Sequence, residues 1–223
     1  MTQPAAQLAL IADQLRALAN NGLLFTEDVY QIERFHTVLN LAAQLQAMID
    51  VRPPAEIARI FQDDLTLRTP LAVVDTAVFD KAGRLLLIQR ADNGLWALPG
   101  GACDVGEAPA TGGVREVWEE SGYQAEPTAL LGVFDSRLCG QNSSRHLYHF
   151  LFAAKLTGGH AIIADETKDV AWFQPEQIPW SKLSPGHEPR IHFALAWQKF
   201  PAIAPFFDRE ALEFTPTLHH PRA

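Results

Sequence analysis

The sequence contains little cysteine and no long apolar run. Its 223 residues include two cysteines, Cys103 and Cys139, too few for the disulfide framework of a small secreted domain. No apolar stretch approaches the roughly 18 residues that a membrane-spanning helix needs. The first residues do not combine a basic segment with an apolar one, as a secretory leader does. We therefore expect a cytoplasmic protein with no membrane partner.

Positive charge is also scarce. The chain carries 18 Lys and Arg against 26 Asp and Glu, a net charge of −8, and its pI is near 5.4. Because nonspecific binding to DNA, RNA or anionic lipids requires a basic surface, none of these is an expected partner. With 48% hydrophobic residues, the chain can bury a full core in one large domain or two small ones.

What the sequence does contain is a concentration of glutamate in one predicted helix. The pattern over residues 109–121 is helical, and Glu116, Glu119 and Glu120 share one face at positions i, i+3 and i+4. Like charges at this spacing repel, so a cation is expected among them, and carboxylate oxygens suit Mg²⁺ or Mn²⁺. A solvated acidic face is the alternative. Four apolar residues on the opposite side should be buried: Ala110, Val114, Val117 and Trp118.

The helix is part of a longer pattern, Gly-x5-Glu-x7-Arg-Glu-hydrophobic-x-Glu-Glu-x-Gly-hydrophobic. Its fixed residues are Gly101, Glu107, Arg115, Glu116, Glu119, Glu120 and Gly122. A chance match has a frequency of about 10⁻⁶ in a chain of this length. The stretch resembles the Nudix box, and residues 71–198 resemble the Nudix hydrolases, which cleave a nucleoside diphosphate linked to another group X.

The resemblance implies a fold and a reaction. The fold is an α/β/α sandwich around a mixed β-sheet, and the reaction is the attack of water on a diphosphate bond with the help of Mg²⁺ or Mn²⁺. Three carboxylates and one backbone carbonyl would hold the cation, those of Glu116, Glu119, Glu120 and Gly101. Arg115 would orient the glutamates, while Glu107 and Gly122 would support the site structurally.

Two sets of residues are candidates for the general base. The first is the pair Glu119 and Glu120 within the box. The second is Glu166, which lies six residues before Trp172. This run resembles the Nudix stretch in which some members carry an extra metal-binding or base glutamate. A solvated loop residue is the alternative interpretation of Glu166.

Four residues outside the box are candidates for substrate binding: Arg90, Trp96, Arg137 and Arg145. The loop over residues 136–144 is rich in Gly, Ser and Asn and is expected at the mouth of the site. Arg137 and Arg145 border this loop and would hold phosphate or a distal group of the substrate; surface arginines are the alternative. Trp96 would line the cleft or else belong to the core.

Residues 1–67 are expected to form a separate helical module. Its helices are predicted over residues 5–20, from an N-cap at Thr26 to about residue 48, and over residues 55–63. Two antiparallel helices can bury only part of their apolar stripes, so the remainder should pack on the catalytic domain or, in a homodimer, on a second subunit.

The expected Nudix domain covers residues 68–205, and residues 206–223 form a tail. Strands are predicted at 71–79, 84–90, 128–135, 145–156 and 169–173, and a closing helix at 188–198. Gly112 and Gly113 lie inside the box helix at a cost of about 1 kcal/mol each, so this helix should depend on tertiary packing. In the tail, His219 and His220 are too isolated for a metal site.

The substrate is expected to be a small-molecule nucleotide. Residues 20–35 are similar to an N-terminal module of the ADP-ribose pyrophosphatase-like Nudix subgroup, which includes CDP-choline pyrophosphatases; a generic helical hairpin is the alternative. CDP-choline and ADP-ribose are therefore the leading candidates. A house-cleaning nucleoside triphosphate pyrophosphatase and a nucleotide sensor without hydrolytic activity remain as alternative functions.

Overall fold

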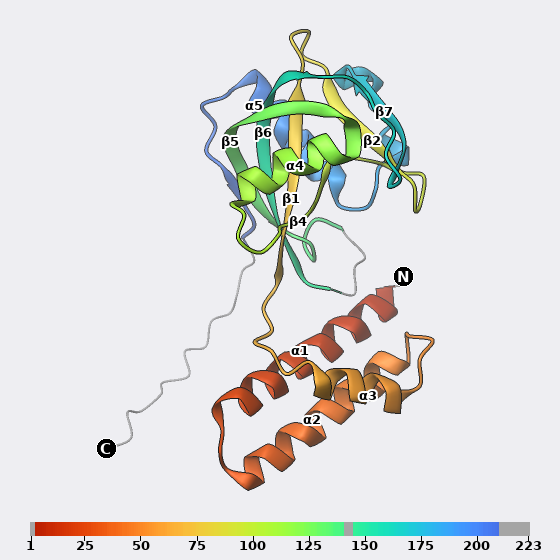
Figure 1. The fold of residues 1–223 in the computed structure, drawn as a ribbon, viewed down its shortest axis with the longest axis vertical. Coiled ribbons are helices and arrows are strands. Elements are labelled where there is room, and N and C mark those ends of the chain that lie inside the picture. Colours follow the sequence, from red (N-terminus) through yellow and green to blue (C-terminus); the bar gives the residue numbers. More distant parts are fainter. Residues whose placement is uncertain (1–2, 141–144, 210–223) are drawn as a thin grey trace, which may run out of the picture.

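The computed structural model describes residues 3–140 and 145–209, in which a mixed β-sheet carries helices on both faces (Figure 1). Three helices precede the sheet: α1 (Gln3–Phe25), α2 (Val29–Ala47) and α3 (Pro54–Asp63). The other helices and strands are β1 (Leu71–Phe79), β2 (Leu85–Arg90), β3 (Trp96–Ala97), β4 (Gly100–Ala102), α4 (Pro109–Ser121), β5 (Tyr123–Asp135), β6 (Leu147–Gly159), β7 (Thr167–Phe173), α5 (His187–Lys199) and β8 (Phe206–Phe207). Two short 3₁₀ turns, Pro175–Gln177 and Trp180–Lys182, lead into α5.

The sheet is organised around β1. Its strand order is β3-β2-β1-β6-β5-β8, with β4 paired to β1 and β7 paired to β2. β1 runs parallel to β6 along its whole length, whereas β2 and β4 join β1 antiparallel. In the β1 and β4 pair, Val74 faces Gly101 and Asp75 faces Gly100. This pairing brings the start of the box onto the central strand.

Alternating side chains of the sheet build two separate cores. On one face, Ala77, Leu85 and Leu87 lie in a cluster with Ile191 and Ala194 of α5. On the other face, Val78, Leu86 and Ala154 pack with Val117 of α4. Figure 1 shows α4 crossing the near face of the sheet. The expected α/β/α sandwich around a mixed sheet, preceded by a small all-α module, is confirmed.

The strands of the second half extend beyond their predicted ends. β5 begins at Tyr123, five residues before the expected start, because it continues its antiparallel pairing with β6 through two irregular steps. Phe206 and Phe207, expected in the tail, form β8 and pair with Gly132 and Val133 of β5. The rest of the expected tail, with its two histidines, lies outside the described residues.

The box helix has its predicted bounds, but of its four apolar residues Val117 alone is buried, while Ala110 and Val114 are half-buried. Val117 is fully buried, whereas the side chain of Trp118 is 57% exposed. Trp118 follows Val117 by about 100° around the helix axis and therefore lies at the edge of the apolar stripe. The expectation that Trp118 belongs to the buried face was wrong.

The two glycines inside α4 allow close packing. A Cβ atom at Gly113 would lie 2.6 Å from the hydroxyl oxygen of Thr76 on β1, and one at Gly112 would lie 2.6 Å from the Glu107 carboxylate. Any side chain at Gly113 would push the helix away from the central strand. The two glycines lower the intrinsic helix propensity of α4, but they allow the helix to pack closely against the sheet. This agrees with the expectation that the helix depends on tertiary packing.

The helical module has its own small core. Buried side chains from all three helices form it: Ala19, Leu39, Ala42, Ala43, Ile57 and Phe61. The N-cap of α2 is Asp28, whose carboxylate accepts the backbone N–H of Gln31 at 2.9 Å, so the prediction of Thr26 was wrong. The hydroxyl of Thr26 instead accepts the N–H of Asp28. Asp28 therefore satisfies the first turn of the helix directly.

The module leaves many apolar side chains uncovered. At the turn between α1 and α2, Phe25 is 81% exposed and Val29 and Tyr30 are each 74% exposed. Further exposed apolar residues of the module are Ile11, Leu18, Leu24, Leu41, Met48 and Val51. None of the described helices is long and apolar enough to cross a membrane. The uncovered residues agree with the expected surplus of apolar surface.

We predict that Gly113→Ala destabilises the protein although alanine favours helix. Propensity alone would add about 1 kcal/mol of stability. The new methyl group would instead press on Thr76, which is fully buried, and we expect a net loss of about 1–3 kcal/mol in the free energy of unfolding. Urea unfolding measures the change in the free energy of unfolding. Thr111→Ala, at an exposed position of the same helix, is the control. A more stable Gly113→Ala protein would contradict the close packing.

Candidate active site

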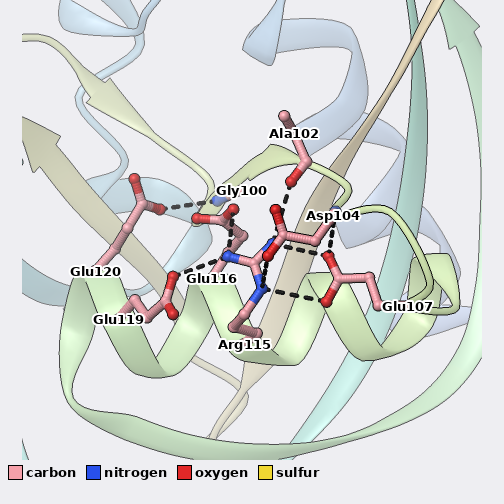
Figure 2. Close-up of polar contacts among 8 residues, drawn as sticks. All are labelled: Gly100, Ala102, Asp104, Glu107, Arg115, Glu116, Glu119 and Glu120. Atoms are coloured by element: carbon pink, nitrogen blue, oxygen red, sulfur yellow. Dashed lines mark hydrogen bonds and ion pairs between the residues drawn. The ribbon is translucent and has the colours of Figure 1, made fainter.

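Arg115 lies at the centre of the box carboxylates (Figure 2). Its Nη1 donates to Glu116 at 2.9 Å and to Glu119 at 2.8 Å. Its Nη2 donates to Glu107 at 2.8 Å and to the backbone carbonyl of Ala102 at 3.1 Å. Hydrogen bonding to Glu107 and to the two helix glutamates raises the pKa of Arg115 above its ordinary value. One guanidinium thus joins the helix to the loop that precedes it.

Glu107 and Gly122 fix the two ends of the box. Glu107 accepts the backbone N–H of Asp104 at 2.7 Å, and its hydrogen bonds to Arg115 lower its pKa. Gly122 ends α4 with φ of 73°, and a Cβ atom there would lie 2.6 Å from the carbonyl oxygen of His160. The left-handed conformation and the close approach both favour glycine. These positions suit the structural roles expected of them.

Glu120 is the box carboxylate that Arg115 does not contact. It is 6% exposed and accepts one hydrogen bond, from the backbone N–H of Gly100 at 2.8 Å. Burial raises the pKa of Glu120 to about 8, and burial also raises the pKa of Glu116. A Cβ atom at Gly101 would lie 2.6 Å from the Glu116 carboxylate. The glycine backbone therefore comes close to a carboxylate whose ionised form is destabilised.

These carboxylates line a cavity of about 690 Å³. Its lining residues are Arg90, Ala91, Asp92, Gly100, Gly101, Ala102, Glu116, Glu120, Asp165 and Glu166. Glu166 reaches the cavity because its backbone carbonyl accepts the N–H of Ala91 at 2.9 Å, at the end of β2. Of the expected ligands, Glu119 does not line the cavity; its side chain is 46% exposed and is held by Arg115.

The donor set fits a hard divalent cation that keeps water or phosphate ligands. Among the described residues, no group of three or more His, Cys, Asp or Glu side chains is close enough to form a complete metal cage. Mg²⁺ normally binds through one or two carboxylates together with waters and substrate phosphates. Glu116 and Glu120 supply two such carboxylates, and the unfavourable burial of their charges is what a cation would relieve.

The four expected substrate contacts have different surroundings. Arg90 lines the carboxylate cavity and forms an ion pair with Asp92 at 2.9 Å. Trp96 belongs to the core cluster that also contains residues of α5, and its ring meets that of Phe173 edge to face at 4.9 Å. Of the two expected places for Trp96, the cleft and the core, the structure places it in the core.

The two loop arginines lie apart from the carboxylate cavity. Arg137 makes a two-pronged contact with Asp135, with the shorter distance 2.6 Å. Arg145 lines a separate cavity of about 260 Å³ together with Arg16 of α1 and Arg68 of the connection between α3 and β1. Residues 141–144 of the loop between them lie outside the described residues. A role for either arginine in substrate binding stays a prediction.

A buried polar cluster beside the box was not predicted. Asp75 of β1 lies 2.8 Å from Nδ1 of His149 on β6 and 3.3 Å from Nη1 of Arg190 on α5. His187 accepts the backbone N–H of Leu98 at its Nδ1, at 3.2 Å. Because these residues come from three elements far apart in the chain, no spacing in the sequence marks them; a charged residue within an apolar strand, such as Asp75, is the one available signal.

Without metal, we predict that Glu120 makes stability fall as pH rises. Its pKa is about 8 in the folded protein against 4.5 for an unburied glutamate, so its contribution is present in full below about pH 4.5 and is lost as pH rises through about 8. Thermal unfolding in EDTA should show that the melting temperature of Glu120→Gln rises relative to that of the wild type as pH increases over this range. Glu126→Gln, on an exposed residue, is the control. Parallel wild-type and Glu120→Gln curves would contradict the burial of this charge.

Two family models match the chain. The family described as NUDIX domain matches residues 69–195, and the family described as UDP-X-like, N-terminal oligomerisation domain matches residues 6–61. Together they cover the sheet domain and the helical module in the order found in the structure. The first match alone spans more than half of the 223 residues.

Individual proteins give the same result. The chain is 36% identical over 175 residues to "Putative ADP-ribose pyrophosphatase YjhB" of Bacillus subtilis (strain 168), covering 78% of this chain and 83% of the relative. A solved UDP-X diphosphatase is similar with a TM-score of 0.57 and 25% identity, over 92% of this chain and 99% of that one. An ADP-ribose pyrophosphatase of Streptococcus suis 89-1591 has a TM-score of 0.56 and 27% identity, over 63% and 100% of the two chains.

The box spacing, the sandwich with its carboxylate cavity, and these matches all agree. The chain belongs to the Nudix hydrolases.

Proposed function

We propose that the chain is a metal-dependent pyrophosphohydrolase that cleaves the diphosphate bond of a nucleoside diphosphate linked to a second group X. The observation that carries the proposal is the cavity in which Glu116, Glu120 and Glu166 surround one space beside Arg90. Relatives named ADP-ribose pyrophosphatase and UDP-X diphosphatase support this class of substrate. ADP-ribose and CDP-choline are the candidate substrates, and Mg²⁺ or Mn²⁺ is the candidate cation.

Different residues of the cavity would bind the cation and the phosphate groups of the substrate. A divalent cation held by Glu116, Glu120 and the Gly101 carbonyl would offset phosphate charge and make a bound water more acidic. Arg115 fixes the orientation of Glu116 through its hydrogen bond. Arg90 extends a fixed positive charge along the same wall, where it would pair with a phosphate oxygen of the substrate.

A carboxylate on the cavity wall accepts the proton of the attacking water. Glu120 is our first assignment, because it lines the cavity and is the box carboxylate that Arg115 does not hold. Glu166 is the second, since it lines the same cavity from the turn before β7. Glu119 is the weaker box candidate, because Arg115 holds it and it does not line the cavity.

A product-resolved hydrolysis screen with Mg²⁺ and with Mn²⁺ tests the proposal. We expect AMP and ribose phosphate from ADP-ribose, or CMP and phosphocholine from CDP-choline. Glu120→Gln keeps the size of the side chain but not its charge, and should lower kcat by about 10²–10⁴-fold. Glu126→Gln, on an exposed residue of β5, should keep wild-type turnover.

The other outcomes point to other functions. Release of pyrophosphate from nucleoside triphosphates would favour the house-cleaning function. Nucleotide binding without turnover would favour a sensor. A loss of less than about tenfold in Glu120→Gln would remove Glu120 from the roles of base and essential ligand.

We also propose that the helical module joins two chains in a homodimer. The family matched by residues 6–61 is described as an oligomerisation domain, and Phe25 and Tyr30 are the module's exposed aromatic residues beside Val29. Sedimentation should give about twice the 24.7 kDa chain mass. The double variant Phe25→Asp with Tyr30→Asp should sediment as a single chain, because two buried charges would oppose contact. Ile163→Asp, on an exposed residue of the sheet domain, is the control, and a wild-type mass near 24.7 kDa would contradict the dimer.

A further inference from the structure

A second cavity of about 420 Å³, which we call the inner cavity, adjoins the carboxylate cavity. The two share four lining residues, Arg90, Gly100, Gly101 and Ala102. The rest of the inner lining is Val73, Val74, Asp75, Asn93, Leu98, Leu147, His149, Ser184, Pro185 and His187. If the diphosphate lies at the carboxylates, as the proposed function requires, a group attached to it enters the inner cavity. The role of the inner cavity therefore rests on the proposed function.

The inner cavity lacks the features that bind a quaternary ammonium group or a stacked base. Among the described residues that line either cavity, none is Phe, Tyr or Trp. Quaternary ammonium groups are held over aromatic faces, and nucleobases are stabilised by stacking on them. The cavity therefore offers little to the choline end of CDP-choline or to a nucleobase.

The carboxylate in the inner cavity is already neutralised by the protein. Burial alone would raise the pKa of Asp75, but the charge of Arg190 and the hydrogen bond with His149 outweigh it and hold this pKa below its ordinary range. Arg190 is fully buried behind the wall. A substrate cation would meet a compensated carboxylate and a nearby guanidinium, so Asp75 serves as a hydrogen-bond acceptor and not as a cation site.

His187 presents a hydrogen-bond donor to the same cavity. Its Nδ1 accepts the backbone N–H of Leu98, so the proton of the neutral ring lies on Nε2. Burial and the charge of Arg190 lower the pKa of His187 to about 3, which keeps the ring neutral. Within residues 3–140 and 145–209, no partner accepts a hydrogen bond from Nε2. The ring lines the cavity with this donor unused.

We propose that the inner cavity binds an uncharged, hydroxyl-bearing sugar of group X, and that His187 determines this specificity by donating from Nε2 to a sugar oxygen. Asp75 supplies an acceptor for a sugar hydroxyl, while Asn93 and Ser184 add an amide and a hydroxyl to the wall. A pocket with both donors and acceptors and no net charge suits vicinal hydroxyl groups. The enzyme then selects nucleoside diphosphate sugars such as ADP-ribose over CDP-choline.

Two substitutions of His187 separate its structural bond from its role in the cavity. In His187→Asn, the side-chain oxygen can still accept the N–H of Leu98, but the donor at the Nε2 position is lost. In His187→Gln, an N–H group reaches about as far as Nε2. We expect His187→Asn to lower kcat/KM for ADP-ribose by about 3- to 30-fold, mainly through KM, with partial recovery in His187→Gln. Hydrolysis of CDP-choline should change little in either variant.

Binding of ribose 5-phosphate and of phosphocholine, the X groups of the two candidate substrates, tests the specificity of the inner cavity without hydrolysis. With Mn²⁺ present, calorimetry should detect ribose 5-phosphate binding to the wild type, weaker binding to His187→Asn, and weaker binding of phosphocholine throughout. Equal or tighter binding of phosphocholine, no binding of ribose 5-phosphate, or equal losses for both substrates in His187→Asn would overturn the proposal. Each of these results leaves the proposed function standing if nucleotides are still cleaved. Binding of ribose 5-phosphate that depends on His187, without cleavage of any nucleotide, would instead support the cavity and reject the function.

Discussion

The active-site half of this protein depends on the charge of Arg115. Three glutamates, Glu107, Glu116 and Glu119, accept hydrogen bonds from this one guanidinium, which offsets repulsion that would otherwise loosen the helix and its loop. Glu120, in contrast, accepts a single backbone hydrogen bond, and the charge of Arg90 on the same cavity wall only partly offsets the burial of its carboxylate. The cavity side of the cluster is therefore short of positive charge. That deficit, more than the number of carboxylates, is the physical reason why the proposed function requires a divalent cation at this site.

The position of the cluster depends in turn on how closely its backbone approaches the central strand. Gly100 and Gly101 pair with Asp75 and Val74, and a Cβ atom at Gly100 would lie 2.1 Å from the carbonyl oxygen of Val74. Gly113 meets the same strand from the helix side. Because side chains are absent at these contacts, the carboxylates of α4 come within reach of the loop backbone. Burial of Glu120 follows from this approach, and its raised pKa follows from the burial.

The sequence was sufficient for features that depend on local spacing. The box helix and the first hairpin follow from residues close together in the chain, and the structure gives the helix its predicted bounds. The expected role of Arg115 came instead from the resemblance of the box to a known family. Features decided by tertiary contact were not predictable. β8 has two residues and exists only because β5 offers an edge. The residues next to Trp96 and Trp118 in the sequence do not show whether either side chain is buried. The packing of the sheet decides that Trp96 is buried and Trp118 is exposed. Asp28 and Thr26 are both of residue types that favour the N-cap position, so residue type alone does not decide which of them caps α2.

The buried charges behind the inner cavity explain why specificity was the hardest part to predict. In the described part of the chain, Nε, Nη1 and Nη2 of Arg190 have no hydrogen-bond partner, and its one ionic partner, Asp75, lies at 3.3 Å. Such a pair is costly to bury, and an apolar replacement of the same volume would often be more stable. The pair does control protonation on the wall of the cavity. The charge of Arg190 lowers the pKa of Asp75, and burial together with Arg190 lowers the pKa of His187, so Asp75 stays ionised and His187 stays neutral. A stability cost concentrated behind a substrate-sized cavity is typical of a binding function, and it becomes visible only when β1, β6 and α5 are assembled.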